Sequence, residues 1–256
     1  MSLSVSTAWD ETAAFTKREA RRLFPIAFLL MSLPAAILQL IAPVTAPGRL
    51  PEPGLWLLFV PAVLAASLIG ALAICRLALC PGAGVRAAFT AAVRGFLPLL
   101  GAVLMIGFAG AVLAMAALLL AVLIAVPVVS TLALLGLLAL LVFFWVRLML
   151  LTPAAAVEPI GPTQLIMRGW ALTSGNFWRL FGFLLAVTIV SLVALMAAGA
   201  VGGIAIRLAA GQPQPGTLAM VLVFLLSALL QAAISGLFTA FLARLYAQLA
   251  GDSPAG

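Results

Sequence analysis

Six long apolar stretches constrain this chain more than any other feature of its sequence. They run roughly over Leu23–Val44, Leu55–Leu79, Phe96–Val126, Ser130–Leu151, Phe177–Ile206 and Thr217–Gln248. Each is long enough for a helix that crosses a membrane, which needs about 20 apolar residues. Hydrophobic residues make up 66% and charged residues 7% of the chain, whereas a soluble domain is about half apolar and a quarter charged. The sequence therefore predicts an all-α polytopic integral membrane protein, a single domain over residues 1–256.

The basic residues are distributed unevenly between the two ends of these stretches. One set of alternate junctions carries Lys17, Arg18, Arg21, Arg22, Arg76, Arg86, Arg94, Arg147, Arg168, Arg179 and Arg244, and the other carries only Arg49 and Arg207. Because cytoplasmic loops of membrane proteins carry the excess of Lys and Arg, we expect six transmembrane helices with both termini in the cytoplasm. Arg strongly outnumbers Lys, which indicates a GC-rich bacterium as the source. For a helical membrane protein of a bacterium we expect the inner membrane as its location. The net charge is +7; because the basic residues lie at helix ends and not along one stripe, we expect anionic lipid, not nucleic acid, as partner.

Three segments before membrane stretches resemble one another. Ala13–Pro25 (AAFTKREARRLFP), Ala87–Pro98 (AAFTAAVRGFLP) and Trp170–Phe181 (WALTSGNFWRLF) align Thr16, Thr90 and Thr173. An Arg-Leu pair then recurs at Arg76, Arg147 and Arg244. This pattern predicts three tandem units, roughly 5–80, 81–153 and 159–248, each an amphipathic interfacial helix on the cytoplasmic face followed by two crossings. The alternative is that Ala- and Leu-rich segments resemble one another by composition alone.

The segment Arg147–Phe183 is the least generic part of the chain. Pro159, Gly161 and Pro162 predict the end of one helix and the start of a short one. Gly175 is suited to end that short helix because glycine tolerates the left-handed conformation, and Asn176 can cap the next helix through its side chain. We expect a helix–elbow–helix bend built from Trp170, Thr173, Gly175, Asn176 and Trp178, with both tryptophans at the membrane interface.

Glu158 is the only acidic residue between Glu52 and Asp252. A lone carboxylate at a membrane boundary is costly unless it is paired or hydrated. Its candidate partners are Arg147, Arg168 and Arg179, which leaves two interpretations open. The first is a structural ion pair that fixes the elbow. The second is a lipid-headgroup site, in which the three arginines hold a phosphate and Glu158 sets their geometry.

The same segment resembles the membrane-domain family attached to some bacterial glycerophosphoryl diester phosphodiesterases. The resemblance covers about forty residues from Arg147 onward and rests on Arg147, Pro153, Glu158, Trp170, Leu172, Thr173, Gly175, Asn176, Trp178 and Arg179. Ser174 stands where the family commonly has a basic residue. The phosphodiesterase activity of that family belongs to a separate soluble domain that uses carboxylates, His and a divalent metal. The resemblance therefore implies a stand-alone membrane module without that activity.

Polar residues within the apolar stretches form a second candidate site. Gln39, Ser191, Ser227, Gln231 and Ser235 could line a polar path for a solute, although such residues more often hydrogen-bond neighbouring helices. The stretches contain no Asp, Glu or Lys near their middle, which argues against an ion-coupled pump. The chain has no His and no recognisable catalytic or metal-binding spacing. We expect no enzyme activity, no metal and no cofactor.

These observations favour a non-enzymatic module of a bacterial inner membrane. In the leading hypothesis its Arg-rich cytoplasmic face binds anionic phospholipid or stabilises a membrane assembly. The first alternative is a transporter or channel-like protein for a lipid or amphipathic solute. The second is an accessory subunit of a larger complex, with a protein partner or further copies of the same chain.

Overall fold

The computed structural model describes residues 5–42, 54–80, 82, 84–124, 127–214 and 216–251. Val44, Arg49 and Val126, which the sequence places in spans or junctions, lie outside these residues. The described part is helical: α1 (Val5–Ile26), η1 (Ala27–Ser32), α2 (Leu33–Ile41), η2 (Leu55–Leu58), α3 (Phe59–Leu79), α4 (Val85–Ile124), α5 (Pro127–Leu148), α6 (Leu151–Val157), α7 (Pro162–Thr173), α8 (Phe177–Ala210) and α9 (Leu218–Gly251).

Six helical segments of the described chain are long and apolar enough to cross a membrane. They are Ala14–Ile41, Leu55–Leu79, Val85–Leu119, Thr131–Val157, Phe177–Ala210 and Leu218–Gly251. The predicted all-α fold with six such helices is therefore confirmed. The structure extends the first stretch further toward its N-terminus and the fourth further toward its C-terminus than hydropathy alone indicates.

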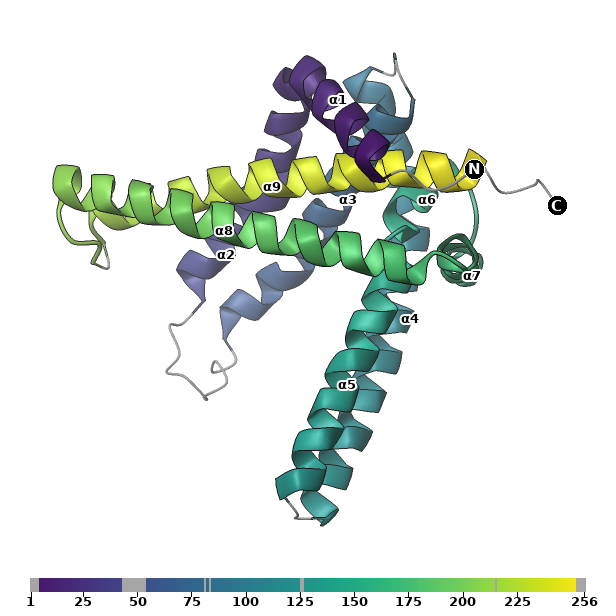
Figure 1. Cartoon of the computed structure of the whole chain (residues 1–256). Coiled ribbons are helices and arrows are strands. Elements are labelled where there is room, and N and C mark those ends of the chain that lie inside the picture. The colour runs from purple at the N-terminus through teal and green to yellow at the C-terminus, as the bar shows by residue number, and fades with distance from the viewer. Residues whose placement is uncertain are drawn as a thin grey trace.

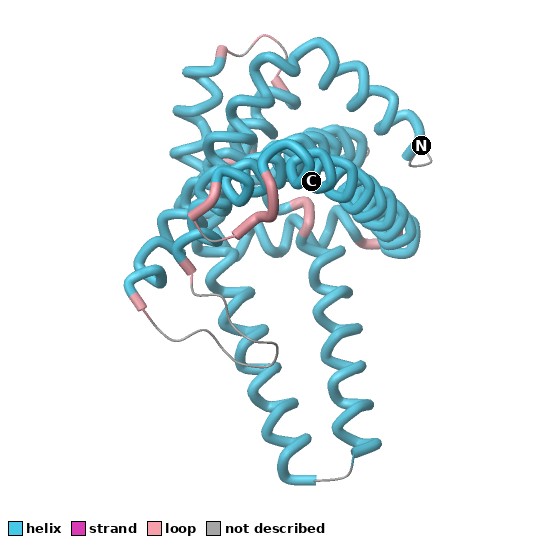
Figure 2. The backbone as a smooth tube through the Cα atoms, turned by 90° about the vertical axis from the view of Figure 1, so that its left-hand side faces the viewer, coloured by secondary structure: helices cyan, strands magenta, loops and turns pink. Residues whose placement is uncertain are grey.

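The long helices diverge from a common region. The hairpin of α4 and α5 projects away from the other helices in both views (Figures 1 and 2). The pair α8 and α9 runs across the direction of that hairpin, and α2 and α3 descend obliquely beside it (Figure 1). We call the region where these helices meet the hub. It contains the end of α3, the start of α4, α6, α7 and the C-terminal half of α9, with α1 packed across α9.

Buried side chains gather in the hub. The largest fully buried ones include Leu72, Ile74, Leu150 and Phe241, and the Phe241 ring stacks on Phe183 with centroids 4.4 Å apart. Away from the hub, apolar side chains face outward along the long helices; Leu208 on α8, for example, is 84% exposed. Apolar residues in this position are expected where the neighbours of a helix are lipid tails.

The three segments predicted as interfacial helices differ in the structure. The first, α1, continues through the π-helical turn η1 into α2; Pro25 and Pro34 flank this turn, and each removes a backbone N–H from the helical ladder. The second is the beginning of α4, which continues through Pro98 without interruption. Only the third, α7, is a separate helix.

Close contacts lie on both sides of Pro98 in α4. A Cβ atom on Gly95 would lie 2.5 Å from the Ala155 carbonyl oxygen of α6, and a Cβ atom on Gly101 would lie 2.9 Å from Cγ of Pro162. Both glycines thus bring α4 against the α6–α7 segment.

Candidate functional site

The elbow between α6 and α8 positions most residues of the first predicted site. Pro162 begins α7, and the Gly161 amide donates a hydrogen bond to Oε1 of Gln164 at 3.3 Å. Gly175 follows α7 with a φ of +84°, a conformation that L side chains rarely adopt. Asn176 precedes α8, but its side chain makes no capping hydrogen bond. The turn therefore depends on the glycine rather than on the asparagine.

Aromatic rings enclose the Arg147 guanidinium at the end of α5. Its Cζ atom lies 4.9 Å from the ring centroid of Trp170, 5.3 Å from Phe143 and 5.6 Å from Phe177. Nη1 also donates to Oγ of Ser174 at 3.3 Å and to Oγ1 of Thr173 at 3.5 Å. Cation–π contacts of this kind stabilise a partly desolvated cation. The rings and hydroxyls of this chain thus compensate the Arg147 guanidinium in part, since its buried Nε atom has no hydrogen-bond partner among the described residues.

Glu158 pairs with Arg168, one of its three candidate partners. Nε of Arg168 donates to Oε1 of Glu158 at 3.0 Å, and the Tyr246 hydroxyl of α9 donates to the same oxygen. The hydrogen bond from Arg168 to the carboxylate raises the pKa of the guanidinium above its usual value. Both charged partners are only partly exposed. Through these hydrogen bonds the network links α7 and the segment after α6 to α9.

Arg179 does not join this network. Its side chain is exposed, and no hydrogen bond or ion pair connects it to another described residue. Trp178, beside it, is 78% exposed and contacts Phe177 and Phe181 through ring edges. The structure thus separates the predicted four-residue cluster into an enclosed Arg147, a paired Glu158–Arg168 and a free Arg179.

A cavity of about 770 Å³ lies on the other side of α6, between the end of α3 and the start of α4. It is lined by Arg76, Gly84, Arg86, Ala87, Thr90, Ala91, Arg94, Gly95, Pro98, Ala155, Ala156, Val157, Glu158 and Pro159. Three arginines therefore reach one cavity. The first turn of α4 also faces it, and the N-terminus of a helix favours negative charge.

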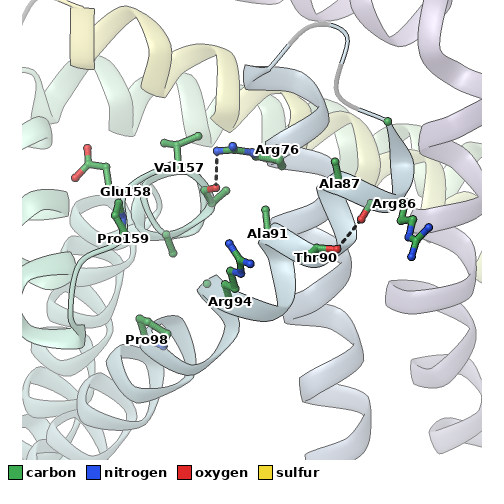
Figure 3. A pocket seen from close by; sticks show the side chains of 14 residues that line it. Arg76, Arg86, Ala87, Thr90, Ala91, Arg94, Pro98, Val157, Glu158 and Pro159 are labelled. Carbon is green, nitrogen blue, oxygen red and sulfur yellow. Dashed lines mark hydrogen bonds between the residues drawn. The ribbon is translucent and has the colours of Figure 1, made fainter.

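The cavity carries uncompensated positive charge. Arg76 and Arg94 turn toward the same opening, whereas Arg86 points away from them (Figure 3). Nη1 of Arg76 donates to the Ala156 carbonyl at 3.3 Å, and the Arg94 guanidinium has no hydrogen bond or ion pair with a described residue. Glu158 is the only carboxylate in the lining, and it is directed away from the arginines, toward its partners Arg168 and Tyr246 (Figure 3).

Arg76 and Arg94 were not predicted as site residues. Both belong to the basic junction before the third membrane stretch, where the sequence indicates topology signals. The aligned segments contain a sequence signal for this cavity. When Thr90 is aligned with Thr173, Arg94 falls at the position of Phe177, and Ala87 falls at the position of Trp170. Small residues and a second cation in place of aromatic rings indicate an open, basic junction.

The predicted polar path is dispersed over several surfaces. Ser191 and Gln231 line a largely apolar groove of about 710 Å³ between α5, α8 and α9. Gln39 on α2 is not part of that groove. Ser227 donates to the Val223 carbonyl at 2.9 Å, and Ser235 to the Ala232 carbonyl at 3.4 Å, both within α9. The structure therefore does not join these five residues into one path.

In the part of the chain that the structure describes, no group of three His, Cys, Asp or Glu residues could hold a metal ion. Comparisons with family models, curated proteins and solved structures found no match to this chain. The resemblance to the phosphodiesterase membrane-domain family thus remains a sequence-based expectation.

Proposed function

We propose that this protein is a non-enzymatic, multi-pass module of a bacterial inner membrane that binds an anionic phospholipid at its basic hub. The observation that carries this proposal is the cavity that Arg76 and Arg94 face. Two cations that share an opening without a carboxylate of their own favour an anionic ligand. Arginine suits phosphate in particular because its planar guanidinium can donate two parallel hydrogen bonds.

The surroundings of the cavity suit a lipid better than a soluble anion. Val93 and Leu97 lie beside the lining on α4 and are 56% and 72% exposed. Further along the same helix, Leu104 and Phe108 also face outward. A phosphate bound at Arg94 would thus sit next to an apolar surface that acyl chains can cover. This arrangement supports a headgroup site at the boundary of the membrane.

The proposal includes the topology expected from the basic residues. Arg76 and Arg94 belong to the junctions predicted to be cytoplasmic, as do Arg147 and Arg168. Single cysteines at Ser174 and Gln212, introduced after Cys75→Ser and Cys80→Ser, would test this placement. A membrane-impermeant maleimide should label Gln212→Cys on intact cells and Ser174→Cys only on inverted vesicles. Labelling of both positions from the same side would contradict the topology.

Native mass spectrometry of the detergent-purified protein tests the proposed activity. We expect wild type to retain an anionic phospholipid and the variant Arg76→Ala/Arg94→Ala to lose it by about tenfold or more, since each charge-assisted contact contributes about 1.5–3 kcal/mol. The matched control is Arg179→Ala/Arg207→Ala, which removes the same charge from two exposed side chains.

The control also decides between two sites. Loss of lipid in the control, with retention in Arg76→Ala/Arg94→Ala, would favour the elbow over the cavity. A wild-type protein that retains no phospholipid, and that shows no preference for anionic over zwitterionic lipid when both are added, would contradict lipid binding altogether.

A further inference from the structure

Three arginines at the ends of membrane helices meet three successive segments of the predicted repeat. Arg147 of α5 contacts Trp170 and Thr173 of α7. The Arg244 guanidinium of α9 lies 5.1 Å from the Phe15 ring of α1. Arg76 of α3 lines the cavity together with Ala87 and Thr90 of α4. Each arginine thus faces the helix that begins the following unit, and the last faces the first, which closes a ring in the hub.

We call each of these arginines, together with the residues around it, a junction and name it after the arginine. The aligned segments show how the Arg147 junction differs from the Arg76 junction. In the register that pairs Thr90 with Thr173, the residues Trp170, Ser174 and Phe177 correspond to Ala87, Ala91 and Arg94. All three of the first set touch Arg147, and all three of the second set line the cavity at Arg76. The cavity therefore occupies the place that side chains fill in the Arg147 junction.

Charge compensation differs in the same way. The rings around Arg147 present their negative faces to the guanidinium. Beside Arg244, a smaller cavity of about 180 Å³ is lined by Phe15 and by Glu19, which supplies a carboxylate that pairs with Arg22 at 3.2 Å. At Arg76, the position of an aromatic ring holds Arg94, a second cation. Arg18 and Arg22 also line the cavity at Arg244, so the contrast holds between the other two junctions. Arg147 has rings around it, whereas Arg76 shares its cavity with a second cation.

We infer that the cavity is an open counterpart of the Arg147 junction, in which a phosphate ester takes the place of the missing side chains. The inference rests on the proposed phospholipid binding and deepens it. The phosphate bridges Arg76 of α3 and Arg94 of α4, so that the bound lipid acts as a structural component that joins the first two units. A ligand in this role stabilises the fold on binding and is not a transported solute.

Exchange of residues between the two junctions tests this inference. The filled variant Ala87→Trp/Ala91→Ser/Arg94→Phe gives the cavity the residues of the Arg147 junction. The opened variant Trp170→Ala/Phe177→Arg gives the Arg147 junction the residues of the cavity. Arg94→Phe alone serves if the triple variant does not fold, because it exchanges two side chains of similar size. Bound lipid is counted by native mass spectrometry, and Tm is measured in detergent with added phosphatidylglycerol, phosphatidylcholine or inorganic phosphate.

We expect wild type to retain one tightly bound anionic phospholipid and to gain Tm with phosphatidylglycerol but not with phosphatidylcholine. The filled variant should retain at least tenfold less anionic lipid, and its Tm should no longer respond to phosphatidylglycerol. The opened variant should retain a second anionic lipid. Equal stabilisation by inorganic phosphate would support the site but assign it to a soluble phosphate, which would contradict the proposed phospholipid function.

Two results would overturn the inference while the proposed function stands. In the first, the filled variant, or Arg94→Phe, retains as much anionic lipid as wild type. In the second, the Tm of wild type does not change with phosphatidylglycerol although the lipid binds, which would exclude a structural role. A wild-type protein without any bound or stabilising lipid would contradict both proposals together.

Discussion

Arg147 and Arg76 stand at the ends of α5 and α3, each followed by a leucine, yet their surroundings differ. Three aromatic rings and two hydroxyls surround Arg147, whereas Arg76 faces a cavity of about 770 Å³ with Arg94 opposite. A partly buried guanidinium needs compensation in either case. A few residues at matching positions thus determine whether side chains of the chain surround the guanidinium or a cavity lies beside it.

The backbone differs between the two junctions as well. At Arg147 the chain turns at Gly175 before α8 begins, and Trp178 after the turn is exposed. At Arg76 the helix α4 continues, and Gly95, in the register position of Trp178, lies against the Ala155 carbonyl of α6. The open cavity thus lies beside a continuous helix, and the filled Arg147 junction lies beside an elbow.

The largest effect is expected from Gly95→Ala. The added Cβ would lie 2.5 Å from the Ala155 carbonyl oxygen, and a backbone atom of a packed helix cannot move away at low cost. We expect the free energy of unfolding to fall by about 3 kcal/mol, measured as a loss of Tm in detergent.

Gly107→Ala is the matched control because a Cβ there meets no atom within 4 Å. Trp178→Ala tests the counterpart position and should cost little, since that side chain is exposed. A Gly95→Ala protein as stable as Gly107→Ala would show that α4 and α6 are not packed as closely as described.

Arg147→Lys should give the next largest effect. Lysine keeps the charge but loses the planar group that lies among Phe143, Trp170 and Phe177 and donates to Ser174. We expect a loss of about 2 kcal/mol in the free energy of unfolding, without a change in retained lipid. Arg76→Lys should show the reverse pattern, with weaker lipid retention and similar stability without lipid. The same pattern in both variants would remove the distinction between the two junctions.

Hydropathy predicted the long helices because length and apolar composition are local properties. The stretch from Leu55 to Leu79 appears as η2 and α3, and the stretch that begins at Phe177 appears as α8. The partner of Glu158 could not be chosen among three arginines, since the choice depends on how α7 lies against α9. The cavity was missed for the same reason: Arg76 and Arg94 line one cavity because α3, α4 and α6 pack against one another.

Gly175→Ala tests the elbow that exists only at the Arg147 junction. The φ of +84° places this residue in the left-handed region, which costs a residue with a Cβ atom about 1–2 kcal/mol. We expect about 1.5 kcal/mol of lost stability. Gly182→Ala on α8 is the control, since no atom lies within 4 Å of its added Cβ. If both variants unfold at the wild-type temperature, the turn is not fixed by Gly175.

The smallest effect is expected from Glu158→Gln, whose side chain lies between the two junctions. It lines the cavity but is bonded to Arg168 and Tyr246 on the other side. The neutral amide preserves the shape and can still accept a hydrogen bond, but it removes the ion pair with Arg168, which is partly exposed. We expect a loss of about 1 kcal/mol in the free energy of unfolding. Glu19→Gln, in the more exposed pair with Arg22, should cost less. Lipid retention measured by native mass spectrometry should stay at the wild-type level, because the carboxylate is turned away from Arg76 and Arg94. Stronger retention of anionic lipid in Glu158→Gln would instead mean that this carboxylate contributes to the charge of the cavity, and that the two junctions are electrostatically one site.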